Sequence, residues 1–524
     1  MTGDNKAICD TREVSEHMIE DKDFSASMGY LFHTQNNVYF YDAGTGRVIQ
    51  LENEEEKQLF QVLFGKVVAK EMKRAVEIGL REGKYDSILS EVNKLNFWRN
   101  GQAIELYSVP HANIETYLCS HIEQLILELT ERCNLRCRYC IYNTSCDLNR
   151  DFGNNDMTRE VALTAIDFAF AHSQEKLSVT FYGGEPLLMF PLMKECISYS
   201  LKKANDFKKQ ISFSFTTNLT LLSKDYALYF ASVPHLSILC SIDGPQDIHD
   251  AWRQFPDGSG SFTKAMEGFH QLRKAFKDKN KTGISVNGVF APPYTRKRLE
   301  KIAMFYDSLD LPEGANCESS YPSTGSVDDS EEIKKYKEGQ GNLNENGEFI
   351  HPFAARQKHL IREQKGIPSE RLNRYNLVKS LHAIHDRPLL FKANVEKIPF
   401  NGCCPPGSRR LYVTTQGEFK VCERIGKSPN IGNIVDGFDL GAIKKHYIED
   451  YNKLSIKDCK SCVVNLLCGI CYAACFNEHG LDIHKKRIVC KAERLRIKEN
   501  LRVYYEMLEE CPEQINKLNS LVNN

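Results

Sequence analysis

The sequence predicts an α/β fold built around a partial, TIM-like (β/α)6 barrel, with an N-terminal winged-helix-like α+β module and a C-terminal Cys-rich domain. Short β-branched runs alternate with longer amphipathic runs between residues 124 and 318, which is typical of βα units. Three short strand-like runs precede them, and nine cysteines lie between Cys403 and Cys490. The length of 524 residues allows about three domains of ~150 residues each.

Six βα units predict the partial barrel. The expected strands are Gln124–Leu129, Ser178–Tyr182, Ser212–Thr217, Leu236–Ile242, Gly283–Phe290 and Ala315–Ser319. The expected helices are Thr158–His172, Leu192–Phe207, Lys224–Ala231, Gly260–Lys277 and Thr295–Ser308. In parallel βα folds, ligand-binding groups gather at the carboxyl ends of the strands. Chemistry-bearing residues are therefore expected directly after the strands.

The N-terminal module is expected to contain three strands followed by three helices between residues 28 and 100. The strands are Tyr30–His33, Val38–Tyr41 and Val48–Leu51. Asn36-Asn37 and Gly44-Thr45-Gly46 supply turn residues for two hairpins. This pattern resembles the precursor-peptide recognition element of peptide-modifying enzymes, and the resemblance implies that a leader peptide is added as an extra strand at an open sheet edge. A purely structural cap is the alternative.

Three cysteines follow the first barrel strand as C-x3-C-x2-C: Cys133, Cys137 and Cys140, with Tyr139 before the last. Three thiolates can hold three irons of a cubane, whereas clusters that only transfer electrons normally have a Cys on each iron. The triplet therefore predicts an iron–sulfur cluster with one open iron. A zinc knuckle or three buried thiols are the alternatives.

Further candidates follow the next strands. Gly183, Gly184 and Glu185 end the second strand, where glycines allow close approach of a ligand and a carboxylate can pair with an ammonium. Thr217 and Asn218 end the third strand. Ser241 and Arg253, near the fourth, offer a hydroxyl for a ribose and a guanidinium for a carboxylate.

The C-terminal cysteines have an internal order that predicts metal binding in a reducing compartment. Gly417 lies 13 positions after Cys404 and five before Cys422, and suits a hairpin turn between Leu411–Thr415 and Phe419–Val421. The later cysteines are Cys459, Cys462, Cys468, Cys471, Cys475 and Cys490. A zinc ribbon is the alternative.

The triplet, the Gly-Gly-Glu segment and the ordered C-terminal cysteines together resemble the radical S-adenosylmethionine (SAM) superfamily, in its SPASM-domain subclass. The resemblance implies three [4Fe-4S] clusters and SAM bound to the open iron near Tyr139. It also implies that Gly183, Gly184 and Glu185 hold the SAM amino group, Ser241 the ribose and Arg253 the carboxylate. Thr217 and Asn218 would face the nucleoside, although relatives often have Thr-Asn-Gly where this chain has Thr-Asn-Leu.

The resemblance also implies two auxiliary clusters. One would take Cys459, Cys462, Cys468 and Cys490. The other would take Cys404, Cys422 and one or both of Cys471 and Cys475, so it is either fully ligated or open at one iron. Cys403 is an alternative to Cys404. The chain departs from the usual SPASM spacing after Cys468, where x2-Cys471 and x3-Cys475 follow.

The function implied is modification of a ribosomally made precursor peptide by a 5′-deoxyadenosyl radical, with Cys thioether formation of the sactipeptide or ranthipeptide type. The alternatives are a formylglycine-generating, anaerobic sulfatase-maturing type, a carbon–carbon crosslinking or epimerising maturase, and a non-catalytic cluster-bearing scaffold. The expected partners are a precursor peptide with its leader and a reductase or a flavodoxin- or ferredoxin-type electron donor. For the acid or base the candidates are Cys317, Glu318 and Tyr321, near the end of the sixth strand.

The net charge of −1 predicts no general attraction to nucleic acid or anionic membranes. No apolar stretch approaches the ~20 residues of a membrane span, and residues 1–6 lack a signal peptide's apolar core. A cytoplasmic protein is expected. The expected domains are residues 1–115 (peptide-recognition-like module), 116–320 (barrel), 321–398 (bridging insertion with helices at Ala354–Glu363 and Arg371–Ile384), 399–495 (cysteine-rich domain) and 496–524 (C-terminal helix). The helix closing the fold is expected at Lys491–Leu508.

Overall fold

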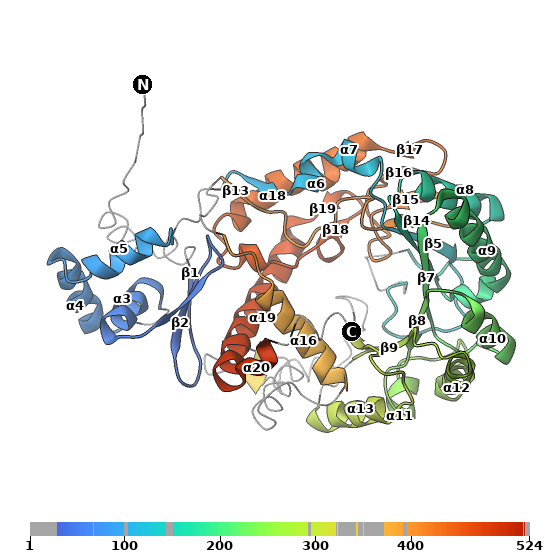
Figure 1. Ribbon diagram of the computed structural model, residues 1–524, viewed down its shortest axis with the longest axis horizontal. Helices are drawn as coiled ribbons and strands as arrows, with labels where there is room; N and C mark the ends of the chain where they lie inside the picture. The colour runs from blue at the N-terminus through green and yellow to red at the C-terminus, as the bar shows by residue number, and fades with distance from the viewer. Residues whose placement is uncertain are drawn as a thin grey trace.

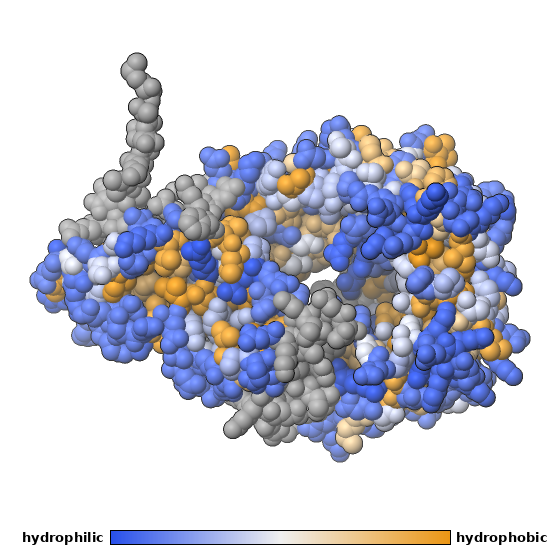
Figure 2. Space-filling view, in the orientation of Figure 1, coloured by the Kyte–Doolittle hydropathy of each residue, from blue (hydrophilic) through white to orange (hydrophobic). Residues whose placement is uncertain are grey.

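The computed structural model describes residues 29–65, 68–98, 103–142, 150–291, 295–320, 322, 342–343, 349–350, 371–390, 396–516 and 518. Figure 1 shows the N-terminal module at the left, the barrel strands with their covering helices at the right, and C-terminal elements between them. Figure 2 shows this face of the molecule hollowed beside the barrel, with a mostly hydrophilic rim.

The centre of the fold is a ten-stranded sheet with the order β10-β9-β8-β7-β6-β5-β14-β15-β16-β17. Its first six strands are parallel neighbours in chain order, which confirms the predicted partial (β/α)6 barrel. These strands are β5 (Gln124–Thr130), β6 (Lys176–Gly183), β7 (Gln210–Thr217), β8 (Leu236–Ser241), β9 (Ile284–Val289) and β10 (Cys317–Ser320).

Helices cover one face of the barrel sheet, and all five predicted helices are present. The helices are α8 (Arg159–Ala171), α9 (Phe190–Phe207), α10 (Lys224–Ser232), α11 (Gln246–Asp250), α12 (Phe262–Asp278) and α13 (Arg296–Ser308), with the short 3-10 helix η1 (Pro186–Met189). Thr158, Ser223 and Thr295 each accept a backbone N–H in the first turn of the helix that follows. These side chains set the start of α8, α10 and α13.

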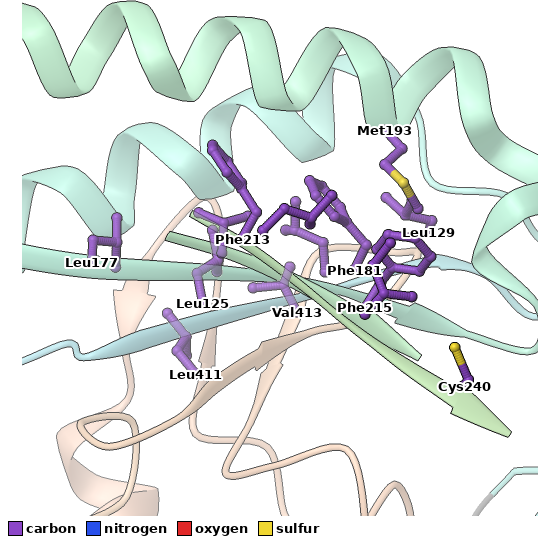
Figure 3. Packing of buried hydrophobic residues seen from close by; sticks show 14 of the residues in the cluster. Leu125, Leu129, Leu177, Phe181, Met193, Phe213, Phe215, Cys240, Leu411 and Val413 are labelled. Carbon is purple, nitrogen blue, oxygen red and sulfur yellow. The ribbon is translucent and has the colours of Figure 1, made fainter. Parts of the chain in front are cut away.

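The two faces of the barrel sheet differ in polarity because each strand alternates. Leucine, valine and phenylalanine side chains pack under the helices, as Figure 3 shows for Leu125, Phe181 and Phe213. The opposite, half-buried face carries hydroxyls, and Thr180 and Ser214 on adjacent strands lie 2.7 Å apart (Oγ1–Oγ). A period of two therefore places an apolar core outside and a hydrophilic lining inside the open barrel.

The cysteine-rich region extends the same sheet. Strand β14 (Leu411–Val413) pairs in parallel with β5, and β15 (Glu418–Lys420), β16 (Gly432–Asn433) and β17 (Gly437–Phe438) continue antiparallel. Gly417 has φ +83° in the turn between β14 and β15, which confirms the predicted hairpin. The remaining elements are β13 (Lys397–Pro399), α17 (Leu440–Ala442), the π-helix η2 (Ile443–Glu449), α18 (Asp450–Cys459), η3 (Asn465–Leu467), η4 (Tyr472–Ala474), β18 (Phe476–Asn477), β19 (Gly480–Leu481), α19 (Ile483–Glu510) and α20 (Pro512–Ile515).

The N-terminal module has the predicted three strands and three helices. The strands are β1 (Gly29–His33), β2 (Val38–Asp42) and β3 (Val48–Leu51), with the order β1-β2-β3, and the helices are α3 (Glu54–Phe64), α4 (Lys70–Arg81) and α5 (Asp86–Lys94). One face of the sheet packs on these helices through Phe40 and Leu51. Phe32 and Tyr39 on the other face pack against α19, where Tyr39 donates a hydrogen bond to Glu509 (2.8 Å).

Between the module and the barrel lie β4 (Glu105–Tyr107), α6 (Val109–Ala112) and α7 (Ile114–Leu118), and β4 pairs in parallel with β13. In the expected bridging insertion, the structure describes β11 (Asn342–Leu343), β12 (Phe349–Ile350) and α16 (Arg371–His385). The helix predicted at Ala354–Glu363 lies outside the described residues. Helix α19 starts at Ile483, earlier than predicted, so Cys490 lies within it and the helix crosses the expected boundary at 495/496. Among the described helices, none is both long and apolar enough to cross a membrane.

Candidate metal and cofactor site

The cysteine triplet lies in the loop directly after β5. The backbone N–H of Leu135 points at Cys133 Sγ (3.4 Å). The pKa of Cys133 is raised to about 12, mainly by burial, and nearby Glu185 and Cys140 contribute to this rise. Burial also raises the pKa of Cys137, with the thiols of Cys140 and Cys133 adding to the shift. The three thiols are therefore electrostatic neighbours, and a bound metal would have to displace their protons.

The two glycines after β6 carry this loop. Gly183 has φ +133°, and an added Cβ there would lie 2.3 Å from the Thr130 carbonyl oxygen. A Cβ on Gly184 would lie 2.1 Å from the Arg132 carbonyl oxygen. The Gly184 N–H donates to Thr130 O (2.9 Å). The close approach that the sequence predicts at these glycines is thus made by the backbone of the cysteine loop itself.

Glu185 is buried beside the same loop. Its carboxylate accepts hydrogen bonds from Leu187 N (3.1 Å), Thr217 Oγ1 (2.8 Å) and Asn218 N (2.8 Å). Burial raises its pKa to about 7 in spite of these donors. Glu185 therefore joins the end of β6 to the end of β7 and places a titratable carboxyl group next to the triplet.

Asp243, just after β8, joins the other side of the loop to the barrel. Its carboxylate accepts a short hydrogen bond from the Tyr139 hydroxyl and one from Arg253 Nε (3.0 Å). The Val289 N–H at the end of β9 also donates to it (3.0 Å). Arg253 and Asp243 are both buried, and Tyr139 stacks on Trp252 with 6.0 Å between ring centroids. The sequence singled out Tyr139 and Arg253 but not Asp243, whose signal is an acidic residue at a strand tip.

Asn218 faces the cysteine loop. Its side-chain amide donates to Asn134 Oδ1 (2.9 Å), and its Nδ2 lies 3.9 Å from Cys133 Sγ. The next residue, Leu219, has φ +69°, the left-handed region that favours glycine. Its side chain is fully buried. The departure from Thr-Asn-Gly therefore keeps the left-handed turn and adds an apolar side chain to the core.

The candidates for an acid or base do not share one face. Cys317 is buried in the core under the helices, next to Val286, and burial raises its pKa to about 12. Glu318 follows it on β10 and lies on the opposite face, toward the open side of the barrel, as strand alternation requires. Tyr321 lies outside the described residues.

Ser241, which the resemblance places at the ribose of SAM, ends β8 and is largely buried.

The C-terminal cysteines form two neighbourhoods. In the first, the pKa of Cys468 is raised to about 12, mainly by burial, and the thiols of Cys462 and Cys459 contribute to this rise. Burial also raises the pKa of Cys490, and Cys459 and Cys462 again contribute. These are the four cysteines that the resemblance implies for one auxiliary cluster, and Cys490 is also an electrostatic neighbour of Cys475.

The second neighbourhood centres on Cys471. The pKa values of Cys475 and Cys422 are both raised to about 12, mainly by burial, and the Cys471 thiol contributes to both rises. Cys403 is buried beside Cys475 and Cys471, whose thiols add to the rise that burial causes in its pKa. Cys404 is half-buried, with Arg409 Nη1 3.9 Å from its Sγ. Arg410 is an electrostatic neighbour of both Cys404 and Cys422, so Cys403 and Cys404 both lie at this neighbourhood.

The donor set at these places consists of cysteine thiols, which are the usual ligands of iron–sulfur clusters. None of the cysteines that the structure describes is in a disulfide. Within that part of the chain, no three Cys, His, Asp or Glu side chains converge closely enough to hold one ion. In a cubane each Cys binds a different iron, so its ligands stand farther apart than those of one zinc ion.

Residues 127–306, which include most of the barrel, match the family model described as the Radical SAM superfamily. A cysteine-type anaerobic sulfatase-maturating enzyme of Clostridium novyi (strain NT) is 30% identical over 193 residues, 36% of this chain and 49% of that relative. A serine-type anaerobic sulfatase-maturating enzyme of Bacteroides thetaiotaomicron is 33% identical over 143 residues, 27% of this chain and 34% of that relative. The matched segments therefore span half or less of these relatives.

The fold is also similar to a solved structure, "Native anSMEcpe with bound AdoMet". The TM-score is 0.50 and the sequence identity 19%, with 76% of this chain and 99% of the other covered. At this identity the similarity concerns the fold alone. It extends beyond the barrel, because the covered share exceeds the segment matched by the family model.

Proposed function

We propose that this chain is a radical SAM/SPASM enzyme that modifies a ribosomally made precursor peptide by hydrogen abstraction and forms Cys thioether crosslinks. The observation that carries the proposal is the pairing of β14 with β5. The strand before the Cys133–Cys140 loop and the hairpin before Cys422 are thereby neighbours in one sheet. A radical-generating cluster and an auxiliary cluster would then share one rigid support.

Cys133, Cys137 and Cys140 would hold the first cluster, and SAM would occupy its open iron. When bound, the reduced cluster and SAM supply a 5′-deoxyadenosyl radical. The protein's part is to fix the loop: Gly184 supports it from β6, and Asp243 anchors it from β8 through Tyr139. Arg253, held by Asp243, and Glu185 are charged groups beside the loop for the carboxylate and ammonium of SAM.

The auxiliary clusters would accept the electron released when the substrate carbon radical closes onto sulfur. Cys459, Cys462, Cys468 and Cys490 would hold one of them. Cys422, Cys471, Cys475 and either Cys404 or Cys403 would hold the other. If only one of Cys471 and Cys475 binds, the second cluster keeps one iron open, and that iron could bind the substrate thiolate. The cofactors carry the chemistry, and the barrel orients them.

Two features support a peptide as substrate. The open face of the barrel is lined by hydroxyl groups such as Thr180 and Ser214, which suits a hydrophilic chain rather than an apolar molecule. In the N-terminal module, β3 is an edge strand among the described strands. Because Asp42 N–H bonds Arg47 O (2.9 Å), alternation along the ladder directs the N–H of Gln50 outward. A leader peptide could pair there as an added strand.

The second candidate is formylglycine formation on a sulfatase. The similarity of the barrel segment to two sulfatase-maturating enzymes favours it. The N-terminal module with its own core favours the precursor-peptide proposal, because it supplies a second binding surface remote from the barrel.

The test is anaerobic reconstitution with SAM and a reductant, followed by mass analysis of a co-expressed peptide. We expect 5′-deoxyadenosine from the parent protein and none after replacement of Cys133, Cys137 and Cys140 by Ala. Cys119→Ala, at an exposed thiol, is the matched control. A scaffold would make no 5′-deoxyadenosine. A thioether maturase removes two hydrogens per crosslink, whereas formylglycine formation from Cys removes sulfur and adds oxygen.

Leader binding is tested at the strand edge. Gln50→Pro removes the outward N–H, and proline is tolerated at edge strands, so the sheet should remain. We expect weaker modification of full-length precursor with unchanged SAM cleavage, while Gln50→Val keeps the N–H and the activity. Equal loss of both activities in Gln50→Pro would favour a structural cap. Deletion of the whole module is less informative, because it would uncover the core shared with α19.

A further inference from the structure

A buried lysine lies among the C-terminal cysteines. Lys486 on α19 is 2% exposed and sits one helical turn before Cys490. Its Nζ lies 2.6 Å from Ser455 Oγ, 3.3 Å from Asn401 Oδ1 and 3.6 Å from Cys459 Sγ. It also lies 4.2 Å from the centroid of the Tyr451 ring.

These neighbours leave the lysine without a carboxylate. Ser455, Asn401 and Tyr451 are neutral, and no Asp or Glu of the described residues forms an ion pair with Lys486. A buried ammonium is costly unless it is paired with an anion. The anion available at this position is the thiolate that Cys459 becomes when it binds a metal.

Asn401 contacts the same lysine and the same cysteine from a left-handed turn. It has φ +53°, a left-handed backbone that Asn adopts more readily than most residues. Its side-chain oxygen accepts from Tyr451 OH (3.0 Å) as well as from Lys486. Cys459 Sγ lies 3.9 Å from it. The Asn401 side chain and the Lys486 ammonium therefore both lie beside Cys459 Sγ.

We propose that Lys486 is a positioning residue that fixes Cys459 and raises the reduction potential of the cluster held by Cys459, Cys462, Cys468 and Cys490. The proposal rests on the proposed function for the cluster itself. Reduction adds one electron to the cluster, and Lys486 keeps its proton throughout. A fixed positive charge next to a ligand sulfur stabilises the reduced, more negative state, so this cluster becomes a better electron acceptor than it would be without Lys486.

The test is an equilibrium redox titration followed by electron paramagnetic resonance. The full chain is used with Cys133, Cys137 and Cys140 replaced by Ala, so that auxiliary clusters alone are titrated. Lys486→Met and Lys486→Gln remove the charge, and Gln keeps a donor for Ser455. Lys486→Arg keeps the charge. Lys491→Met removes an exposed charge next to Cys490 and is the matched control.

We expect the oxidised-to-reduced ratio of one cluster, at fixed potential, to rise at least tenfold in both neutral variants, a shift of about 59 mV to lower potential for a one-electron couple. Lys486→Arg and Lys491→Met should match the parent. An unchanged potential in either neutral variant would overturn the proposal, even if iron content falls, because the resonance reports the loaded molecules. A parent without auxiliary clusters would instead contradict the proposed function.

Discussion

The left-handed residue after β7 provides a sharp test of the local structure at the site. Leu219 has φ +69° and is fully buried. Leu219→Ala removes the buried side chain, which costs about 2–5 kcal/mol, and keeps the left-handed backbone. Leu219→Gly removes the same side chain but also relieves a left-handed penalty of about 1–2 kcal/mol. The greater freedom of glycine in the unfolded chain takes back about 0.4–1 kcal/mol.

The difference between these two terms predicts that Leu219→Gly is more stable than Leu219→Ala by about 0–1.6 kcal/mol, with a midpoint of about 0.8 kcal/mol, although both are less stable than the parent. The free energy of unfolding is measured by guanidinium titration of metal-free protein. In the control pair at Ala227, within helix α10, the change to Gly should lower stability by about 1 kcal/mol. If Leu219→Ala were more stable than Leu219→Gly, residue 219 would not have the left-handed backbone described here.

Three further predictions concern the surroundings of the cysteine loop. Asp243→Asn leaves Arg253 buried without its counter-ion, and we expect a loss of about 3–5 kcal/mol in the free energy of unfolding, measured by guanidinium titration. Burial lowers the pKa of His249 from 6.5 to about 4, so the free energy of unfolding of the parent should fall by on the order of 3 kcal/mol between pH 6.5 and pH 4. A His249→Gln variant should not show this loss. Parallel pH profiles of unfolding for the two proteins would contradict the prediction. Gly184→Ala forces a Cβ to within 2.1 Å of the loop carbonyl and should reduce iron bound by the triplet. Gly258→Ala, at a turn with φ +83° and nothing within 4 Å, adds only backbone strain away from the triplet and should not reduce it. Equal iron contents in the two variants would refute the packing argument.

Much of the fold could be predicted because its signals are local. The alternation of strands and amphipathic runs gave all six barrel strands and five helices, and the Gly417 hairpin was evident from one glycine between two β-branched runs. The start of α19 at Ile483 was missed because the closing helix was expected only after Cys490, although Asp482 supplies an N-cap by accepting the Lys485 N–H (3.0 Å).

The candidate site was predictable in its residues but not in its connections. Cys133 and Glu185 were found from their positions after strands, whereas Asp243 was not, because its role depends on partners that are distant in sequence. Lys486 was missed for a similar reason: a lysine in a charged helix is usually exposed. Burial of that lysine depends on how α19 packs beside α18, which spacing alone does not determine.

The central claim is that the cluster at Cys133, Cys137 and Cys140 keeps one iron open for SAM. The most direct measurement is electron–nuclear double resonance of the reduced protein with SAM labelled by 15N at its amino group. We expect a nitrogen coupling that disappears when the three cysteines are replaced by Ala. A parent protein that carries this reduced cluster but shows no coupling to the labelled nitrogen would contradict the account.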